Sequence, residues 1–119
     1  MADIPKQAFS NAGAAVTTQA TVSGGDSVRF GGTRTIVVFR NGHTSAITVS
    51  MPPVKANAAQ PGTGIAAVPT RSRAVAQNEI AIFDLKPGEV DNFIDGAGNI
   101  NFTYTGHNAL LVAAAIDAA

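Results

Sequence analysis

The sequence predicts an all-β protein: an antiparallel β-sandwich or jelly roll of seven to nine short strands, preceded by an extended N-terminal arm. Val, Ile and Thr together number 31 of the 119 residues and Leu only 3, a bias that favours strands over helical bundles. From residue 26 onward, segments of alternating apolar and polar residues recur roughly every 8 to 12 residues between turn residues. We therefore expect an arm at 1–26 and one sandwich domain at 27–119.

The predicted arm shows no sustained hydrophobic period. Its large apolar residues are Ile4, Phe9, Val16 and Val22, spread among Ala, Thr, Ser, Asn, Gln and Gly. Such a segment buries too little area to offset its ordering entropy, about 1–2 kcal/mol per residue. We expect it to find no partner within its own subunit, and to use these four residues as anchors on a neighbour. A mobile terminus is the alternative.

Three strands are predicted in the first half of the sandwich, at 27–30, 34–40 and 44–50. The segment Arg34–Arg40 is apolar on both sides at its centre, which predicts a central strand with both faces covered. Asn41-Gly42 predicts a two-residue type I′ hairpin into the next strand. In that strand Ile47 and Val49 should face the core.

A long loop follows, because Met51-Pro52-Pro53 ends the preceding strand. Val54–Thr70 has little pattern, and a loop of this length in so small a domain predicts a binding or interface loop. Ile65 and Val68 could form a short edge strand within it. Arg71 and Arg73 come just after it as a close basic pair, suited to holding carboxylates or carbonyls of a partner protein. A solvated loop face is the other interpretation.

The second half predicts further short strands at 73–77, 79–85, 90–94, 99–105 and 109–116. In the second of these, Ile80 and Ile82 share one face. Lys86–Glu89 predicts a type II turn, with proline and glycine at its central positions. The segment Asn99–Thr105 has the clearest alternation. For Ala109–Ile116 the alanine run favours a helix and the position after a meander favours a strand; we predict a strand.

No motif predicts catalysis, a metal or a cofactor. His43 and His107 each follow a glycine in a predicted turn, and neither has an acidic residue within four positions, so exposed turn histidines are expected. Asp91–Gly96 has the acidic and glycine positions of a calcium loop, but Phe93 and Phe102 stand where oxygen ligands are needed. No serine lies in a nucleophile elbow, and we expect no enzyme.

Charge, cysteine content and hydropathy limit the kinds of partner and the kinds of compartment that the chain suits. Eight basic residues balance eight acidic ones, and charged residues make up 13%, so nothing predicts binding to nucleic acid or an anionic membrane. The chain has no cysteine, which suits synthesis in a reducing cytosol. It shows no apolar run long enough for a membrane helix and no Sec-type leader, so we expect a soluble protein.

The series of strands carries a family resemblance. Gly25-Asp26 to Phe30, Arg34 to Gly42 with Ile47-Thr-Val, Glu79 to Gly88 and Asn99 to Thr105 stand in an order that resembles small virion proteins of tailed bacteriophages. These are head decoration (capsid cement) proteins and related minor structural proteins with a β-sandwich fold. The resemblance covers roughly residues 25–117.

The resemblance implies a non-enzymatic protein, made in the host cytoplasm, that binds the outer surface of the assembled capsid. Its partner would be the major capsid protein, and the chain would form a homo-oligomer, a trimer or dimer, that stabilises capsomer junctions. A head–tail connector or tail protein is an alternative. A second is a small β-sandwich binding module for carbohydrate or protein, although the chain has no Trp and a single Tyr.

Overall fold

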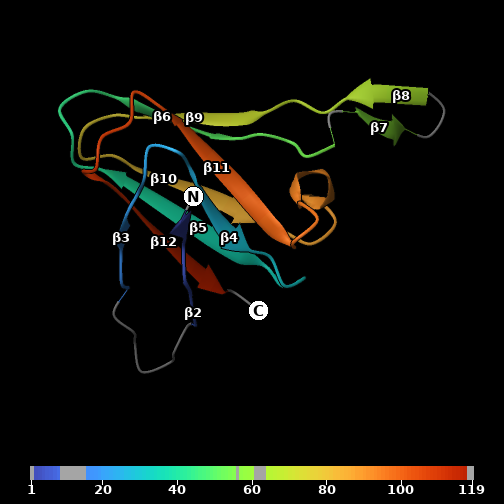
Figure 1. Ribbon diagram of the computed structural model, residues 1–119, viewed down its shortest axis with the longest axis horizontal. Coiled ribbons are helices and arrows are strands. Elements are labelled where there is room, and N and C mark those ends of the chain that lie inside the picture. The colour runs from blue at the N-terminus through green and yellow to red at the C-terminus, as the bar shows by residue number, and fades with distance from the viewer. Residues whose placement is uncertain (1, 9–15, 56, 61–63, 118–119) are drawn as a thin grey trace.

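Two β-sheets face each other across one core (Figure 1). The computed structural model describes residues 2–8, 16–55, 57–60 and 64–117. The first sheet contains, in order, β1 (Ala2–Asp3), β4 (Asp26–Arg29), β11 (Asn99–Thr105), β6 (Ile47–Met51) and β9 (Arg71–Val75). The second contains β10 (Ile80–Leu85), β5 (Thr35–Asn41), β12 (Leu111–Asp117) and β2 (Lys6–Ala8), with β3 (Gln19–Ala20) also paired to β12. The predicted antiparallel β-sandwich is confirmed.

All but one of the strands predicted from residue 26 onward are present, with shifted ends. Nine strands, β4 to β12, lie among the described residues of this part, and β12 confirms the strand prediction for the last segment. The segment predicted at 90–94 differs. It forms a single 3₁₀ turn at Asp91–Phe93, and Ile94 then makes an isolated bridge to Ile100. The type II turn before it is supported by a φ of 84° at Gly88 and a Glu89 N–H to Lys86 carbonyl bond.

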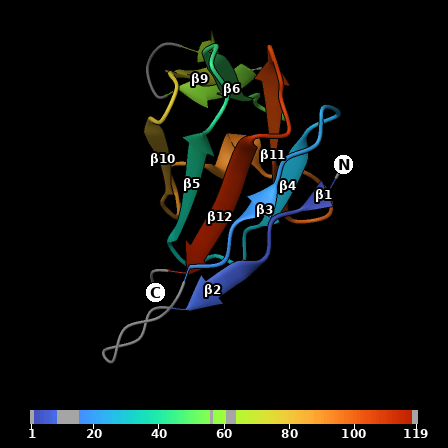
Figure 2. The same ribbon diagram turned by 90° about the vertical axis from the view of Figure 1, so that its left-hand side faces the viewer.

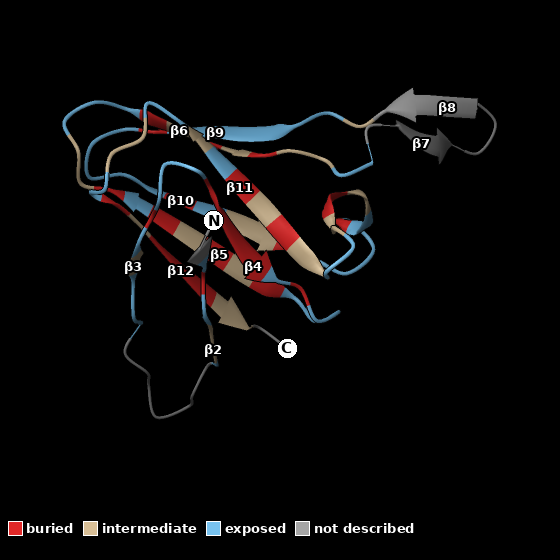
Figure 3. Cartoon of the chain, in the orientation of Figure 1, coloured by how far each residue is buried: buried red, intermediate tan, exposed pale blue. Residues whose placement is uncertain are grey.

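The core forms where the inward-facing rows of the two sheets meet (Figure 3). Ile47 and Val49 on β6 are fully buried, as predicted. Phe39 of β5 and Phe102 of β11 make the central contact between the sheets, edge to face with ring centroids 5.1 Å apart. Phe83 of β10 lies 5.8 Å from Phe39, so aromatic rings from three strands fill the centre.

Strand β5 is central, but only one of its faces is covered. Val37 and Phe39 are fully buried, whereas Ile36 and Val38 are half-buried and Arg40 is exposed. The prediction of two covered faces is therefore wrong within the described part of the chain. The apolar residues of the second face lie on the outer side of the second sheet.

The Asn41-Gly42 hairpin prediction is also wrong, because β5 and β6 lie in different sheets. A type I′ turn needs positive φ at both positions, and neither residue has it. Asn41 is instead the buried end of β5. Its side-chain amide donates to the carbonyls of Ser45 (2.9 Å) and Val75 (2.8 Å) and accepts from the N–H of His43 (2.8 Å). The chain turns a corner between sheets around this side chain.

The expectation that residues 1–26 have no partner in their own subunit is wrong as well. Strand β1 runs parallel to β4, β2 runs parallel to β12, and β3 pairs antiparallel with β12 (Figure 2). Ile4 lies in the chain between β1 and β2. It is 2% exposed, and its backbone N–H donates to the Ser27 carbonyl at 2.7 Å. The segment adds strands to an edge of each sheet, and sheet edges bind a chain through its backbone whatever its hydrophobic pattern.

The long loop at 54–70 contains a separate hairpin, β7 (Asn57–Gln60) and β8 (Gly64–Ala67). This hairpin belongs to neither sheet and extends away from the end of the sandwich (Figure 1). The strand predicted for this region is thus present, but it pairs only within the loop.

Candidate interaction surfaces

The four residues predicted as anchors of the N-terminal segment have different surroundings. Ile4 belongs to the core of its own subunit. The prediction that it anchors a neighbouring molecule is therefore wrong, because a residue that is only 2% exposed cannot contact a neighbour. Val16 and Val22 are exposed, at 54% and 38%. Phe9 lies outside the described residues. An interface role for the two valines stays a prediction.

The projecting hairpin carries the residues predicted in the long loop. Ile65 lies in β8, where only the backbone is described. Val68, just after β8, is half-buried and packs on the core, so it holds one end of the hairpin to the sandwich. At the other end, the N–H groups of Val54 and Lys55 both donate to the Asn92 carbonyl, at 2.8 and 3.0 Å. The hairpin therefore projects from a fixed base.

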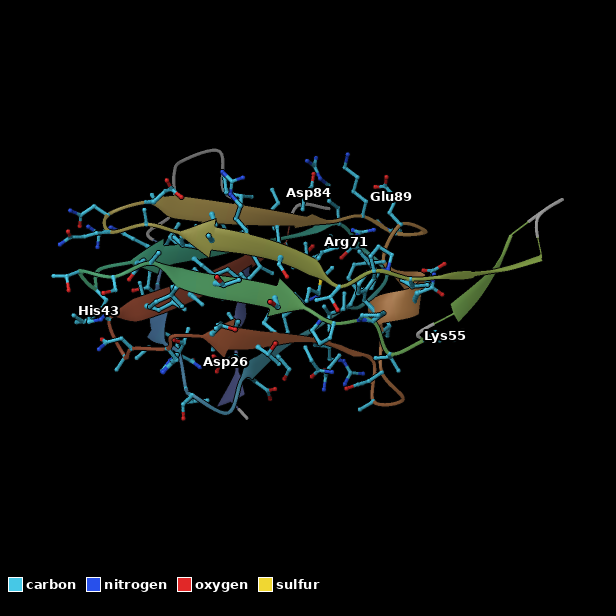
Figure 4. All side chains as sticks on the ribbon, turned by 90° about the horizontal axis from the view of Figure 1, so that it is seen from above. Asp26, His43, Lys55, Arg71, Asp84 and Glu89 are labelled. Atoms are coloured by element: carbon cyan, nitrogen blue, oxygen red, sulfur yellow. The ribbon has the colours of Figure 1, made fainter. Side chains whose placement is uncertain are left out.

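Arg71 and Arg73 lie on edge strand β9, where their cross-strand partners are the buried Met51 and Val49. Opposed residues share a face, so both arginines point to the inner side of the sheet, at its open edge. Arg71 donates to the Glu89 carbonyl at 3.1 Å, and its guanidinium lies 4.7 Å from the centre of the Phe93 ring (Figure 4). Arg71 therefore covers one end of the core with its guanidinium, although as a whole residue it is exposed, as Arg73 is. Inward-pointing charges of this kind also protect a sheet edge from pairing with other chains.

The two histidines lie on adjacent loops, which the Gly42 N–H to Leu110 carbonyl bond joins. His107 lies against Tyr104, with ring centroids 5.3 Å apart, and its Nε2 is 2.8 Å from the Thr21 hydroxyl. That hydroxyl already donates its one proton to the Leu111 carbonyl, so Nε2–H of His107 is the donor. These contacts fix the loop, and neither of them is to a carboxylate.

Two carboxylates on the surface have lowered pKa values. Arg34 donates two hydrogen bonds to Asp84, at 2.8 and 2.9 Å, and this lowers the pKa of the Asp84 carboxyl. The pKa of Asp95 is lowered by the backbone N–H of Asn99 and then by the Asn101 amide. Both arrangements are structural. No group of three or more His, Cys, Asp or Glu side chains suited to a metal occurs among the described residues.

An apolar surface that sequence reasoning missed covers the outer side of the second sheet. Registers of β10, β5 and β12 place alternate residues of the three strands in shared rows. We define the outer face by its exposed or half-buried apolar members: Ile36, Val38, Ile80, Ile82, Val112 and Ile116. Ile80 and Ile82 are 57% and 65% exposed. The apolar residues on both sides of Arg34–Arg40 were the signal, but they were interpreted as burial within one chain.

Comparisons with known proteins give no relative. No family model matches the chain, and neither a curated protein nor a solved structure matches it. Within the described part of the chain, no helix has the length and apolar character needed to span a membrane.

Proposed function

We propose that this chain is a non-enzymatic structural protein of a tailed bacteriophage that binds the outer surface of the assembled capsid as a decoration (cement) protein. Its partner is the major capsid protein, whose capsomer junctions it stabilises. The observation that carries the proposal is the β7–β8 hairpin, which projects from a base fixed by Asn92 and Val68. The strand series resembling phage virion proteins supports the same assignment.

The hairpin suits a contact that is repeated many times. It leaves the two sheets complete, because it pairs with neither of them. A rigid base lowers the entropy lost when a projecting segment binds. The low charge of the chain gives little long-range attraction to any partner, so holding power must come from many modest contacts repeated by the symmetry of the lattice.

The direct test is cryo-electron microscopy of phage particles assembled with and without this chain. The proposal expects extra density on the outer head lattice only when the chain is present. Density at the neck or tail alone would instead assign a connector or tail role. Particles that never contain the chain would refute every virion role.

A matched pair of variants tests the hairpin. In the first, a short Gly-Ser linker replaces residues 57–67; in the second, L110S changes a residue that is 56% exposed on the β11–β12 loop. Both should keep the far-ultraviolet circular dichroism of the sandwich. Only the linker variant should lose cosedimentation with heads that lack the native chain. If it binds as the unmodified chain does, the hairpin is not the contact.

A further inference from the structure

Asn41 and Gly42 form the one Asn-Gly pair in the sequence. In such a pair the backbone nitrogen of the glycine can attack the side-chain amide carbon of the asparagine, because glycine has no side chain to hinder the approach. The new C–N bond closes a five-membered succinimide ring, and the side-chain –NH2 leaves as ammonia with the proton that the glycine nitrogen gives up. Water then opens the ring at either carbonyl, which leaves aspartate or its β-linked isomer, isoaspartate, at position 41.

The fold holds the attacking nitrogen of this pair in a hydrogen-bonded peptide unit. The Gly42 N–H donates to the Leu110 carbonyl at 3.0 Å. The carbonyl of the same peptide unit, which belongs to Asn41, accepts from the Asn78 N–H at 2.7 Å. The unit that would close the ring is therefore bonded on both sides, to the β11–β12 loop and to the β9–β10 turn.

The amide group under attack is held as firmly. Asn41 is fully buried, and its –NH2 donates to the carbonyls of Ser45 and Val75 at 2.9 and 2.8 Å. Its side-chain oxygen accepts from the His43 N–H at 2.8 Å. The amide cannot turn toward the Gly42 nitrogen, or release ammonia, without breaking these three bonds. Water, which the second step needs, does not reach a fully buried side chain.

We propose that Asn41-Gly42 is a self-modification site that the fold closes and unfolding opens, and that the modified chain cannot return to the native structure. Aspartate at position 41 has no N–H for the carbonyls of Ser45 and Val75, and its charge would be buried without a partner. Isoaspartate lengthens the backbone by one carbon at the corner between the two sheets. Unfolding therefore becomes irreversible at the rate at which Asn41 is converted. The proposal goes beyond the proposed function, because it concerns the chain's own chemistry and needs no capsid.

Incubation of the full chain in mildly alkaline buffer, with and without guanidinium chloride, tests whether the fold controls the reaction. Mass spectrometry detects conversion as the gain that follows replacement of –NH2 by –OH, and peptide mapping locates it at position 41. Conversion of Asn41 should be at least about tenfold slower without denaturant, because only molecules that open can react. Equal rates in the two buffers, or no conversion in guanidinium, would overturn the proposal.

The variant G42A is the matched comparison, because a methyl group on the attacking residue slows ring closure and leaves the Asn41 amide in place. Gly42 has no positive φ, and an added Cβ would lie 3.3 Å from the Leu110 carbonyl oxygen and 3.6 Å from the Leu110 Cβ. In guanidinium, where neither chain is folded, G42A should convert severalfold more slowly than the unmodified chain. G42A keeps Asp95-Gly96, which rearranges through the same type of ring, so the difference between the chains comes from position 42.

Refolding shows whether the modified chain is excluded from the native structure. Samples are withdrawn from guanidinium at increasing times and diluted, and the β-sheet circular dichroism that each regains is compared with its conversion at Asn41. The regained fraction should fall in step with conversion, and it should fall more slowly for G42A relative to its own first sample. Converted chains that refold with an unchanged thermal midpoint, or a loss of refolding that G42A does not slow, would overturn the proposal. None of these outcomes bears on capsid binding, which the microscopy tests separately.

Discussion

The Tyr104 hydroxyl donates a 2.6 Å hydrogen bond to Oδ2 of Asp26, and this bond joins β11 to the first residue of β4. Asp26 is fully buried, and the same oxygen accepts only a longer bond, 3.2 Å, from the N–H of Val22. Its Oδ1 has no hydrogen-bond partner among the described residues. A buried carboxylate with so few donors depends strongly on each of them.

The variant Y104F should lower the free energy of unfolding by about 1.5–3 kcal/mol, the usual contribution of a hydrogen bond to a charged group. The ring stays, so its packing against Phe39, 6.0 Å away between centroids, is kept. Urea denaturation measures the change. In a double-mutant cycle with D26A the two effects should not add, because both variants remove the same bond. Additive effects would show that the bond contributes little.

Tyr104 should also make the protein sensitive to alkali. Burial, and secondarily the hydrogen bond to Asp26, raise the pKa of Tyr104 well above its usual value. The unfolded chain releases the phenol proton near pH 10, while the folded chain keeps it. The stability from this group is therefore complete below about pH 10, and it is lost as the pH rises toward the raised value.

The measurement is direct, because the chain has one Tyr and no Trp. The tyrosinate absorbance should appear together with the loss of β-sheet circular dichroism as alkali is added. Tyrosinate forming near pH 10 in a chain that is still folded would contradict the assignment. Y104F provides the control for alkaline unfolding by other groups.

We expect substitutions that remove the side-chain N–H donors of Asn41 to destabilise the fold strongly. In N41D a carboxylate of the same shape would face the carbonyls of Ser45 and Val75, which now accept from the amide. We expect a loss of at least about 3 kcal/mol in unfolding free energy, since an unpaired charge would be buried beside two acceptors. N108D is the control, because the Asn108 side chain only accepts a bond, from the Leu110 N–H at 2.9 Å, and a carboxylate can accept the same bond. Thermal melting compares the two, and similar midpoints would contradict the role of the amide.

Asn41 also shows what the sequence could predict and what it could not. Local alternation predicted β11 and the inward direction of Ile47 and Val49, because a strand with one buried face must repeat every two residues. The asparagine was assigned to a turn on the same local grounds. Its actual role depends on the carbonyl of Val75, 34 positions away, which no local pattern contains.

The same reason separates the correct and incorrect parts of the interface prediction. The long loop after Pro53 was visible as a break in alternation, and it does contain the projecting hairpin. Arg71 was seen as a free basic group, but its contact with Phe93 comes from the fold. The outer face needed the order of β10, β5 and β12, which pairs strands far apart in the sequence.

The N-terminal segment gives the last prediction, because its pairing with both sheets makes it part of the folded domain. I4A should lower the free energy of unfolding by about 2–5 kcal/mol, the usual cost of deleting a buried isoleucine side chain beyond Cβ. V16A removes an apolar side chain that is 54% exposed, and it should change stability by less than about 0.5 kcal/mol. Guanidinium denaturation of both variants distinguishes a structural segment from a free arm, since a free arm would give two small values. Removal of residues 1–22 should then destabilise the sandwich itself, so any loss of capsid binding in that truncation has to be compared with I4A before it is assigned to a lost contact.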